Sequence, residues 1–495
     1  MSIPIILAID EGTTNAKAIA VGRDGRMLAK ASVPLLLDHP RPGWAEQDPI
    51  AIWQAVVQAI GDCLARLPDV QVQGVAISNQ RESVMIWERS SGRPLTPVVS
   101  WQCRRSQDFC QELAQSDRAA LIYQTTGLPV DPLFPAAKVR GMLAALPLGV
   151  ERAARGELCA GTLDSWLNWQ FTAGQSFSTD YSNASRTQLF NIHQGCWDEA
   201  LLAIFAVPAA SLAHVKPSAA IHGYTQSGQV PGLAGGIPIA ALIGDSHAAL
   251  YGQGGNQAGD VKATYGTGSS LMLAMNHLPD HGQGLGSTVA WHDGQIRYAL
   301  EGNITHTGAA LSWVARLLGV SSLTHLSDMA LSVSGNQGVF FVPALSGLGA
   351  PYWDSQARGL ICGLTDAATP DVLARVGLES IAYQVADVFF AMERAAGHRL
   401  PALRVDGGAT QNHWLMQFQA DLLQRPLIRN LNAEVSALGA AYLAGKTLGW
   451  WPDNAHIAAL PREVEYIEPC AETAQMHDNY KLWQMAVARA RYQPE

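Results

Sequence analysis

The stretch AIDEGTTNAKAIAV, residues 8–21, contains an apolar segment ending at Asp10, a turn of acid, glycine and threonines, and a second apolar segment. Glycine lets the backbone approach a ligand closely, and backbone amides together with the hydroxyls of Thr13 and Thr14 can donate hydrogen bonds to phosphate oxygens. Asp10 stands where it can hold a magnesium ion directly or through water. Taken alone, however, a turn of this kind is usually a plain β-hairpin.

The residues around this turn predict an α/β fold. Apolar runs separated by glycine turns predict three consecutive strands within residues 1–38. Asp48 and Pro49 are typical of a helix N-cap and first helical position, and the run VQGVAIS (72–78) predicts another strand. The first part of the chain is therefore expected to alternate strands with helices.

The second half of the chain repeats this pattern. Apolar residues between Leu378 and Met392 line one predicted helix, which is expected to stop near Gly397 before a strand over LPALRV, residues 400–405. The turn TYGTGSS, residues 264–270, resembles the turn at residue 10 in its glycines and hydroxyls. We therefore expect a duplicated domain with its boundary near residue 250.

Three glycine turns together favour a nucleotide site. Gly266, Thr267 and Gly268 offer the same phosphate-binding chemistry as the first turn, and DGGAT (406–410) adds a third turn before a possible helix with Asn412 near its start. Three such turns suggest one nucleotide held between two lobes. GAAYLAGKT (439–447) resembles a P-loop, but its glycine spacing is one residue too long, and a closely packed small-residue helix is the better interpretation.

Polar side chains after two other strands indicate a polyol or sugar site. Arg81 and Glu82 lie side by side after a strand and can donate to and accept from adjacent hydroxyls, although a surface ion pair is the alternative. Trp101 offers a flat apolar wall, or is ordinary core. Asp245 follows an apolar strand and can accept a hydroxyl proton during phosphoryl transfer, while a helix N-cap is its plainer role.

Composition limits the partners of the chain. The net charge is −9 over 495 residues, without a basic block, so neither nucleic acid nor an anionic membrane surface is an expected partner. No apolar run reaches the roughly 20 residues of a membrane span, so we expect no membrane insertion. Seven scattered cysteines fit a reducing compartment, and we expect a cytoplasmic protein.

Nine segments, in order along nearly the whole chain, carry a family resemblance. They are DEGTTN, SNQRE, WQCRR, TDYSNASRT (179–187), GDSHAAL, YGTG, GLGAPYWD (347–354), RVDGGATQN and ALGAAYLAG. Together they resemble the FGGY carbohydrate kinases, and specifically their glycerol kinase branch. The resemblance implies two actin-like, ribonuclease-H-like ATPase domains, over residues 1–250 and 251–495, with ATP and the polyol in the cleft between them. We also expect a homo-oligomer, either a dimer or a tetramer.

The resemblance assigns roles residue by residue. It implies that Asp245 is the catalytic aspartate and that Asp10 and Asp245 accompany Mg²⁺. The first domain would hold the polyol and the second the adenosine. The residues implied to contact ATP are Thr13, Thr14, Lys17, Thr267, Gly308, Leu311, Ser312, Gly408, Ala409 and Asn412. The residues implied to contact the polyol are Arg81, Glu82, Trp101, Leu133, Asp245, Ser246 and Ser270.

Several positions depart from the family pattern. Lys17 replaces the usual arginine, which keeps the charge but loses the planar fork, and Gly141 stands where a tryptophan is usual. Leu133, Ser246 and Ser270 stand where glycerol kinases usually have tyrosine, glutamine and phenylalanine. The two serines open space and add hydroxyls around the far end of a three-carbon substrate.

Two substrate classes and two non-kinase functions follow from these observations. The kinase hypothesis is transfer of the ATP γ-phosphoryl group to glycerol, giving glycerol 3-phosphate, or to a larger polyol or ketose such as a tetritol, pentitol or pentulose. The alternatives are a non-metabolic actin-like ATPase and a degenerate kinase that only binds sugar. The polyol cluster argues against the first, and the presence of Asp10, Thr13 and Asp245 argues against the second.

Overall fold

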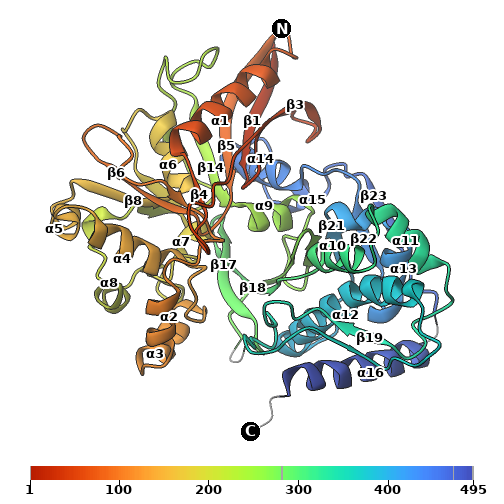
Figure 1. The fold of residues 1–495 in the computed structure, drawn as a ribbon. Coiled ribbons are helices and arrows are strands. Elements are labelled where there is room, and N and C mark those ends of the chain that lie inside the picture. Colours follow the sequence, from red (N-terminus) through yellow and green to blue (C-terminus); the bar gives the residue numbers. More distant parts are fainter. Residues whose placement is uncertain (1, 280–281, 472, 493–495) are drawn as a thin grey trace. The chain divides into compact units, whose positions relative to one another are not determined.

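The computed structural model describes residues 2–279, 282–471 and 473–492 and divides into two compact units (Figure 1). Unit 1 comprises Met1–Asn256, Ser287–Ala299 and Glu434–Pro461, and unit 2 comprises Gln257–Gly286, Leu300–Ala433 and Arg462–Glu495. The units interleave along the chain, because a segment close to the C-terminus packs with the N-terminal half.

Unit 1 is built on a six-stranded sheet of order β13-β14-β5-β1-β2-β3. The three strands predicted at the start of the chain are confirmed as an antiparallel meander. β1 also pairs in parallel with β5, and β5 with β14, so the carboxyl ends of these three strands meet at one edge. The strands are β1 (Ile3–Glu11), β2 (Asn15–Val21), β3 (Met27–Pro34), β5 (Val70–Asn79), β13 (Gly223–Tyr224) and β14 (Pro238–Gly244).

Helices cover both faces of this sheet. Ile5, Leu7 and Ile9 of β1 pack into one core with α1 (Pro49–Leu64) and α6 (Leu163–Phe171). Because side chains alternate along a strand, Asp10 points to the opposite face. There α14 (Val435–Thr447) packs on β1, β5 and β14 and on α9 (Asp245–Gly252). The predicted start of α1 is confirmed, since the Asp48 carboxylate accepts from the backbone N–H groups of the first helical turn.

Close packing explains the glycines of α14. A Cβ atom at Gly439 would lie 1.8 Å from the carbonyl oxygen of Ala248 in α9. The stretch that resembles a P-loop is thus a small-residue helix pressed against its neighbour, as the spacing predicts.

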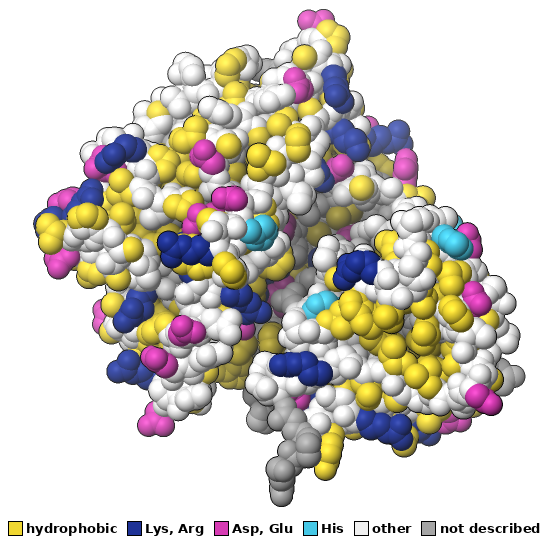
Figure 2. Space-filling model, in the orientation of Figure 1, with side chains coloured by type: hydrophobic (Ala, Val, Ile, Leu, Met, Phe, Trp, Pro, Cys, Tyr) yellow, Lys and Arg dark blue, Asp and Glu magenta, His cyan; other side chains and the backbone are white. Residues whose placement is uncertain are grey.

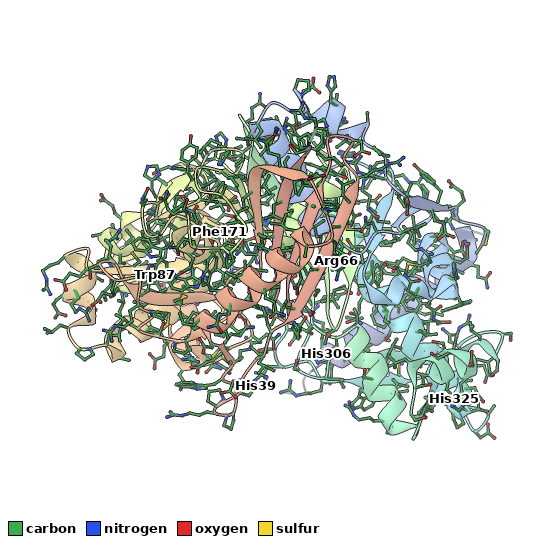
Figure 3. The ribbon with its side chains drawn as sticks, turned by 90° about the horizontal axis from the view of Figure 1, so that it is seen from above. His39, Arg66, Trp87, Phe171, His306 and His325 are labelled. Atoms are coloured by element: carbon green, nitrogen blue, oxygen red, sulfur yellow. The ribbon has the colours of Figure 1, made fainter. Side chains whose placement is uncertain are left out.

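A second sheet of unit 1 has the order β4-β7-β6-β8. The ring of Trp87 in β6 packs against the rings of Trp166 and Phe177, with 5.3 Å and 5.2 Å between ring centroids. Figure 3 labels Trp87, together with Phe171 of α6. The strands are β4 (Glu46–Gln47), β6 (Val84–Glu88), β7 (Val98–Val99) and β8 (Leu158–Thr162). The other elements of unit 1 are α2 (Gln107–Ala114), α3 (Arg118–Thr126), α4 (Pro135–Ala145), α5 (Gly149–Ala154), β9 (Ser178–Asp180), α7 (Tyr181–Ala184), β10 (Phe190–Asn191), β11 (Cys196–Trp197), α8 (Glu199–Phe205), β12 (His214–Lys216) and α15 (Asn454–Ala458).

Unit 2 repeats the central topology of unit 1. A hairpin of β15 and β16 is antiparallel, and β15 pairs in parallel with β21, just as the β1–β2 hairpin pairs with β5. β22 and β23 extend the sheet beyond β21. The predicted duplication is therefore visible in the strand pairing. The strands are β15 (Val261–Tyr265), β16 (Ser269–Met275), β21 (Leu403–Asp406), β22 (Leu427–Asn430) and β23 (Val464–Ile467).

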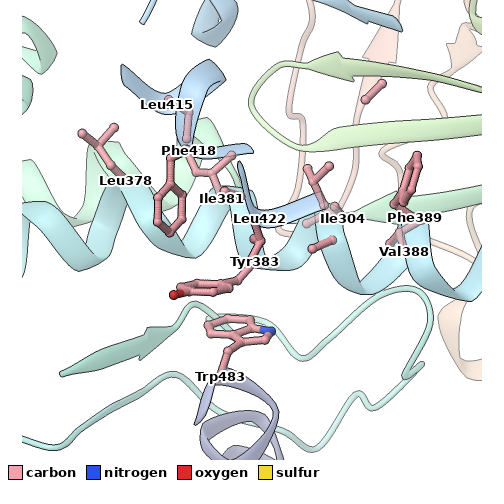
Figure 4. Close-up of a cluster of buried hydrophobic side chains, with 14 of the residues drawn as sticks. Ile304, Leu378, Ile381, Tyr383, Val388, Phe389, Leu415, Phe418, Leu422 and Trp483 are labelled. Atoms are coloured by element: carbon pink, nitrogen blue, oxygen red, sulfur yellow. The ribbon is translucent and has the colours of Figure 1, made fainter. Parts of the chain in front are cut away.

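The long helix α12 organises the core of unit 2. It ends at Ala396, and Gly397 adopts a left-handed conformation with φ of 71°, as its predicted helix stop requires. Figure 4 shows Tyr383 of α12 stacked on Trp483 of α16, with 5.1 Å between ring centroids. The helices are α10 (Gly308–Leu317), α11 (Leu323–Leu331), α12 (Pro370–Ala396), α13 (His413–Leu423) and α16 (Thr473–Arg491). β17 (Gly286–His292) belongs to unit 1 apart from Gly286, β18 (Ile296–Ile304) runs from unit 1 into unit 2, and β19 (Phe340–Val342) and β20 (Leu360–Cys362) belong to unit 2.

The surface of the molecule carries charges of both signs. On the face shown in Figure 2, Lys and Arg side chains are interspersed with Asp and Glu, and hydrophobic side chains gather over part of unit 2. Within the residues that the structure describes, no helix has both the length and the apolar character that crossing a membrane requires.

Candidate active site

The first glycine turn closes the β1–β2 hairpin of unit 1. The Gly12 N–H donates to the Asn15 carbonyl at 2.9 Å. The Thr13 hydroxyl donates to Oε1 of Gln80 at 3.2 Å and accepts from the indole N–H of Trp101 at 3.0 Å. Trp101 is 38% exposed, so it forms a wall beside the turn and is not ordinary core. The side chain of Thr13 therefore links the phosphate turn to the predicted polyol wall.

Asp10 lies at the end of β1 within a group of charges. Its carboxylate accepts from the Ser78 hydroxyl at 3.1 Å and lies 3.8 Å from Nζ of Lys17. Burial raises the pKa of Asp10 to about 6, Lys17 works against this shift, and the charge of Asp245 adds to it. A cation bound at this carboxylate would therefore relieve an unfavourable burial of negative charge.

Lys17 has a partner that the sequence did not indicate. Its ammonium group donates to Glu434 at 2.7 Å, and Lys30 reaches the other oxygen of the same carboxylate at 3.3 Å. Burial alone would lower the pKa of Lys17, but the charges and hydrogen bonds of Asp10 and Glu434 outweigh it and raise the pKa. Lys17 is thus held charged beside Asp10 by a residue 417 positions away.

Asp245 follows β14 and is the first residue of α9. Gly244 is the N-cap, so the plainer interpretation of Asp245 as the cap residue was wrong by one position. Oδ1 of Asp245 accepts from the Ser246 N–H at 2.6 Å and from Nε of Arg81 at 3.2 Å. A second guanidinium nitrogen of Arg81 donates to the Ser246 hydroxyl at 3.3 Å. Because the Asp245 side chain is 36% exposed, this carboxylate is both oriented by the protein and open to a ligand.

Glu82 and Arg81 do not form the surface ion pair that was the alternative for them. Both are buried, Arg81 turns to Asp245, and Glu82 accepts from Nε of Arg186 at 2.6 Å. The two neighbouring side chains therefore belong to two separate ion pairs.

The segment 179–187 forms hydrogen bonds with the ends of β14 and β5. The Ser182 hydroxyl accepts from the Gly244 N–H at 2.9 Å, directly before Asp245. The side-chain amides of Asn183 and Asn79 exchange two hydrogen bonds of 3.0 Å, two residues before Arg81. The sequence alone assigned no role to this segment. Its many hydroxyl and amide side chains were the signal that could have indicated a supporting hydrogen-bond network.

The three positions that depart from glycerol kinases fall in two units. Leu133 lies in the loop before α4, and its carbonyl accepts from Nζ of Lys138 at 2.7 Å. Ser246 touches Arg81, as described above. Ser270 belongs to unit 2, where its hydroxyl donates to Glu301 at 3.2 Å. Leu133 and Ser246 are therefore in the unit that carries Arg81, Glu82 and Trp101.

Unit 2 brings the predicted nucleotide turns together. The Gly308 N–H donates to the Gly266 carbonyl at 3.1 Å, and a Cβ atom at Gly308 would lie 2.7 Å from that oxygen. Gly407 has φ of 98°, and a Cβ atom there would lie 2.3 Å from the Tyr265 carbonyl oxygen. The segments around residues 266, 308 and 407 thus pack too closely for larger residues. Leu311, Ser312, His306 (Figure 3) and the exposed Thr267 lie in the same segments.

Asn412 and Gly408 differ in what they offer a nucleotide. Asn412 caps α13, its Oδ1 accepting from the Leu415 N–H at 3.0 Å, and its amide donates to Ser327 at 3.3 Å. Its side chain is thus used within the protein. Gly408 is exposed, and a Cβ atom there would meet no protein atom within 4 Å. Ala409 follows it and is partly buried.

The carboxylates fit a magnesium ion that arrives with a nucleotide. In the described part of the chain, no group of three or more His, Cys, Asp or Glu side chains is arranged as a metal cage. Mg²⁺ usually takes one or two carboxylates and completes its shell with water and phosphate oxygens. Asp10 and Asp245 match that donor set. The pKa of Asp10 is raised, and the charge of Asp245 contributes to that shift.

A separate cavity of about 610 Å³ in unit 2 contains none of the predicted site residues. Two of its lining arginines donate to backbone carbonyls at the end of α13: Arg425 to those of Leu423 and Gln424, and Arg399 to that of Gln424. These contacts neutralise the carbonyl end of α13 and give this part of the cavity a structural explanation.

The two units repeat one hairpin-and-strand arrangement, with a partly buried aspartate at one hairpin and glycine turns at the other, and these features suit a two-domain phosphotransferase. Residues 5–252 match the N-terminal domain of the FGGY family of carbohydrate kinases, and residues 261–448 match the C-terminal domain of that family. The chain belongs to the FGGY family, near the glycerol kinases, and is an ATP-dependent carbohydrate kinase that works with Mg²⁺.

Curated relatives cover the whole chain. It is 67% identical over 495 residues to the apulose kinase of Pectobacterium atrosepticum, covering 100% of each chain. It is 41% identical over 490 residues to glycerol kinase 2 of Thermotoga maritima, covering 98% of each chain.

Solved structures agree with the fold. The crystal structure of Plasmodium falciparum glycerol kinase with ADP is 30% identical, has a TM-score of 0.94 and covers 99% of each chain. The xylulose kinase of Rhodospirillum rubrum, 24% identical with a TM-score of 0.87 over 98% of each chain, shares the fold. The predicted pair of ribonuclease-H-like domains is thereby confirmed.

Proposed function

We propose that this kinase phosphorylates a terminal hydroxyl of a five-carbon ketose and that apulose is its first candidate substrate. The observation that carries the proposal is the 67% identity to an apulose kinase over all 495 residues, against 41% for a glycerol kinase. A difference of this size over full-length chains favours the substrate of the more similar relative.

The residues of unit 1 support a substrate larger than glycerol. Leu133 cannot donate or accept through its side chain, and Ser246 is short and carries a hydroxyl held near Arg81. A tyrosine and a glutamine at these positions would fill space that a longer substrate needs. A site that hydrogen-bonds the hydroxyls of a ketose would discriminate against a substrate that lacks them.

Positioning is the main task of the proposed site. Trp101 would lie along the carbon chain, Glu82 would accept from substrate hydroxyls, and Arg81 would hold the Asp245 carboxylate toward the reacting hydroxyl. Asp245 would accept the hydroxyl proton as that oxygen attacks the γ-phosphorus of ATP. When bound, Mg²⁺ would neutralise charge on the phosphate oxygens. Asp10 would hold that ion, with Asp245 beside it.

The nucleotide residues divide between side-chain and backbone roles. We propose that Thr14 and Lys17 face the phosphates from unit 1 and that Thr267, Gly308, Leu311, Ser312, Gly408 and Ala409 bind the nucleotide from unit 2. Asn412 would act by fixing the start of α13, because its side chain caps that helix.

A coupled ADP-release assay tests the substrate. Apulose, xylulose, ribulose, erythritol and glycerol are compared with saturating ATP and Mg²⁺. We expect kcat/KM for apulose to exceed that for glycerol by at least about tenfold, which corresponds to about 1.4 kcal/mol. Equal values for glycerol and the ketoses would contradict the proposal.

Glycerol is the second candidate, because several curated glycerol kinases are 41–44% identical to the chain and a glycerol kinase of solved structure shares its fold with a TM-score of 0.94. The variants Leu133→Tyr and Ser246→Gln restore the residues that the glycerol kinase branch usually has. We expect the double variant to shift the ratio of kcat/KM toward glycerol by about tenfold. An unchanged ratio would show that these positions do not select the substrate.

Three further assignments complete the proposal. We place the domains at residues 1–250 and 251–495, the protein in the cytoplasm and the active form in a homo-oligomer. Seven unpaired cysteines, four of them buried, support a reducing compartment. Light scattering after size-exclusion chromatography measures the oligomeric state.

A further inference from the structure

Glu82 is held in an unusual backbone conformation. Its φ is 62°, in the left-handed region that residues with a Cβ rarely adopt. Such a conformation is retained only where the surroundings fix it, and it is common at binding sites. Glu82 is 5% exposed, so the groups that fix it are protein groups.

Arg186 holds the carboxylate of Glu82. Its Nε lies 2.6 Å from Oε1 of Glu82, and Arg186 is only 2% exposed. The same guanidinium lies over the ring of Phe134, with 5.2 Å between the guanidinium carbon and the ring centroid. A planar guanidinium can do both at once, which an ammonium group cannot.

Lys138 holds the backbone of Glu82. Its Nζ donates to the Glu82 carbonyl at 3.4 Å and to the Leu133 carbonyl at 2.7 Å, and the residue is 1% exposed. Burial lowers the pKa of Lys138 to about 7, although the charge of Glu82 opposes this shift. Two carbonyls are thus bridged by one buried amine.

These contacts join Glu82 to the loop 131–134 in two places. Arg186 connects the Glu82 carboxylate with Phe134, and Lys138 connects the Glu82 backbone with Leu133. The loop's other ion pair, Arg104 with Asp131 at 3.2 Å, is exposed on the arginine side and contributes little. The position of Glu82 relative to Leu133 and Phe134 is therefore set by two buried side chains, Arg186 and Lys138.

We propose that Arg186 and Lys138 are positioning residues that determine substrate selectivity, because they fix Glu82 and Leu133 at the distance that a five-carbon ketose requires. This inference rests on the proposed function, in which Glu82 and Leu133 contact the substrate. In this proposal neither Arg186 nor Lys138 touches the substrate itself. Their loss would widen or relax the substrate site and leave the nucleotide turns of unit 2 unaltered.

The variants Arg186→Lys and Lys138→Met test the proposal. We expect each to raise KM for the ketose at least about tenfold, to change KM for ATP less than twofold, and to reduce the preference for apulose over glycerol about tenfold. A shorter polyol depends less on the far end of the site, so its kcat/KM falls less.

Arg375→Lys is the matched control. Arg375 is also buried, pairs with a glutamate through Nε at 2.9 Å and lies over an aromatic ring, Trp414, at 3.8 Å. It belongs to α12 of unit 2 and is not among the residues assigned to substrate or nucleotide. This variant reports what a buried arginine contributes to stability alone, and its KM values and substrate ratio should equal those of the wild type.

A milder variant keeps the test decisive if Arg186→Lys does not fold. Phe134→Leu removes the ring under the guanidinium and leaves the ion pair with Glu82, and we expect a two- to fivefold rise in KM for the ketose. If the variants that fold lower kcat alike on every substrate with unchanged KM values and substrate ratio, the positioning role is wrong. If the wild type does not phosphorylate apulose, the proposed substrate fails, and the variants are then judged on the substrate that the wild type prefers.

Discussion

The two hairpin turns share a topology but differ in chemistry. In unit 1 the turn follows Asp10, whose partner across the hairpin is Lys17. In unit 2 the corresponding hairpin pairs Thr264 with Ser270, and the turn between them consists of Gly266, Thr267 and Gly268. One turn is surrounded by charged side chains and the other by backbone groups.

This difference indicates a division of tasks between the copies. Charged groups at fixed positions stabilise charge that develops during phosphoryl transfer, whereas glycine turns let a nucleotide approach backbone amides. The first copy is therefore suited to the chemical step and the second to holding ATP. Variants of the first copy should lower kcat, and variants of the second should raise KM for ATP.

The largest effect is expected in unit 1, for Asp245→Asn. Asparagine keeps the shape of the side chain but cannot accept the proton, so we expect kcat to fall about 10³-fold. Arg81 would lose an ionic partner and keep its contact to the Ser246 hydroxyl. Steady-state ADP release with the preferred sugar measures the effect, and circular dichroism checks that the variant is folded. Retention of more than a tenth of the activity would assign the proton to another acceptor.

The next effect concerns Mg²⁺ and pH at Asp10. Its pKa of about 6 in the folded protein means that protons compete with the cation below that pH. We expect the apparent affinity for Mg²⁺ to weaken about tenfold for each pH unit below 6 and to be constant above pH 7. Activity is titrated with Mg²⁺ at a fixed total concentration of ATP between pH 5 and 8. Asp10→Asn should abolish this pH dependence and weaken the binding of Mg²⁺ at every pH. If the variant instead keeps the pH profile of the wild type, Asp10 does not belong to the metal site.

Local signals predicted much of the fold. The Asp48 cap, the glycine stop at residue 397 and the strand before Asp245 each depend on a few neighbouring residues, and all three are where the sequence places them. Turns and caps are determined over short distances, so one sequence suffices to find them.

The supporting residues of the site were not predictable in this way. Arg186 meets Glu82 across 104 positions, and Glu434 meets Lys17 across 417. Neither pair has a sequence spacing that marks it, because the contact arises only when sheets and helices pack. The missed residues therefore share one property: they act on a predicted site residue from a distant segment.

The third effect in order of size is expected at Gly408, in the predicted nucleotide turn of unit 2. A Cβ atom at this position meets no protein atom within 4 Å, and its backbone is not left-handed. The substitution Gly408→Ala is therefore compatible with the protein, and any effect on ATP comes from the nucleotide. We expect KM for ATP to rise about fivefold to tenfold and kcat to change less than twofold.

Gly335 provides the control for this substitution. It also has open space around a Cβ atom and no left-handed backbone, and it lies outside the predicted nucleotide segments. Gly335→Ala should leave KM for ATP as in the wild type. Equal KM values in both variants would move the nucleotide away from Gly408.

The smallest effect is expected for stability, at Glu11. This residue is 0% exposed; one oxygen accepts from Gln80 at 2.9 Å, and the other has no hydrogen-bond partner among the residues that the structure describes. Burial raises the pKa of Glu11 well above its usual range, against the Gln80 hydrogen bond. The folded protein thus binds this proton more tightly than the unfolded chain. Stability is full below the unfolded pKa of about 4.3 and falls as pH rises toward the folded pKa.

Glu11→Gln removes this loss of stability at high pH, since the amide stays neutral at every pH and its oxygen can still accept from Gln80. We expect the free energy of unfolding in urea to rise by about 1 kcal/mol at pH 8 and to be unchanged at pH 4. Lys262→Met in β15 of unit 2 removes another buried ionisable side chain, away from the first turn, and should not reproduce this pH pattern. A gain of equal size at pH 4 and pH 8 would show that folding does not shift the pKa of the Glu11 carboxyl.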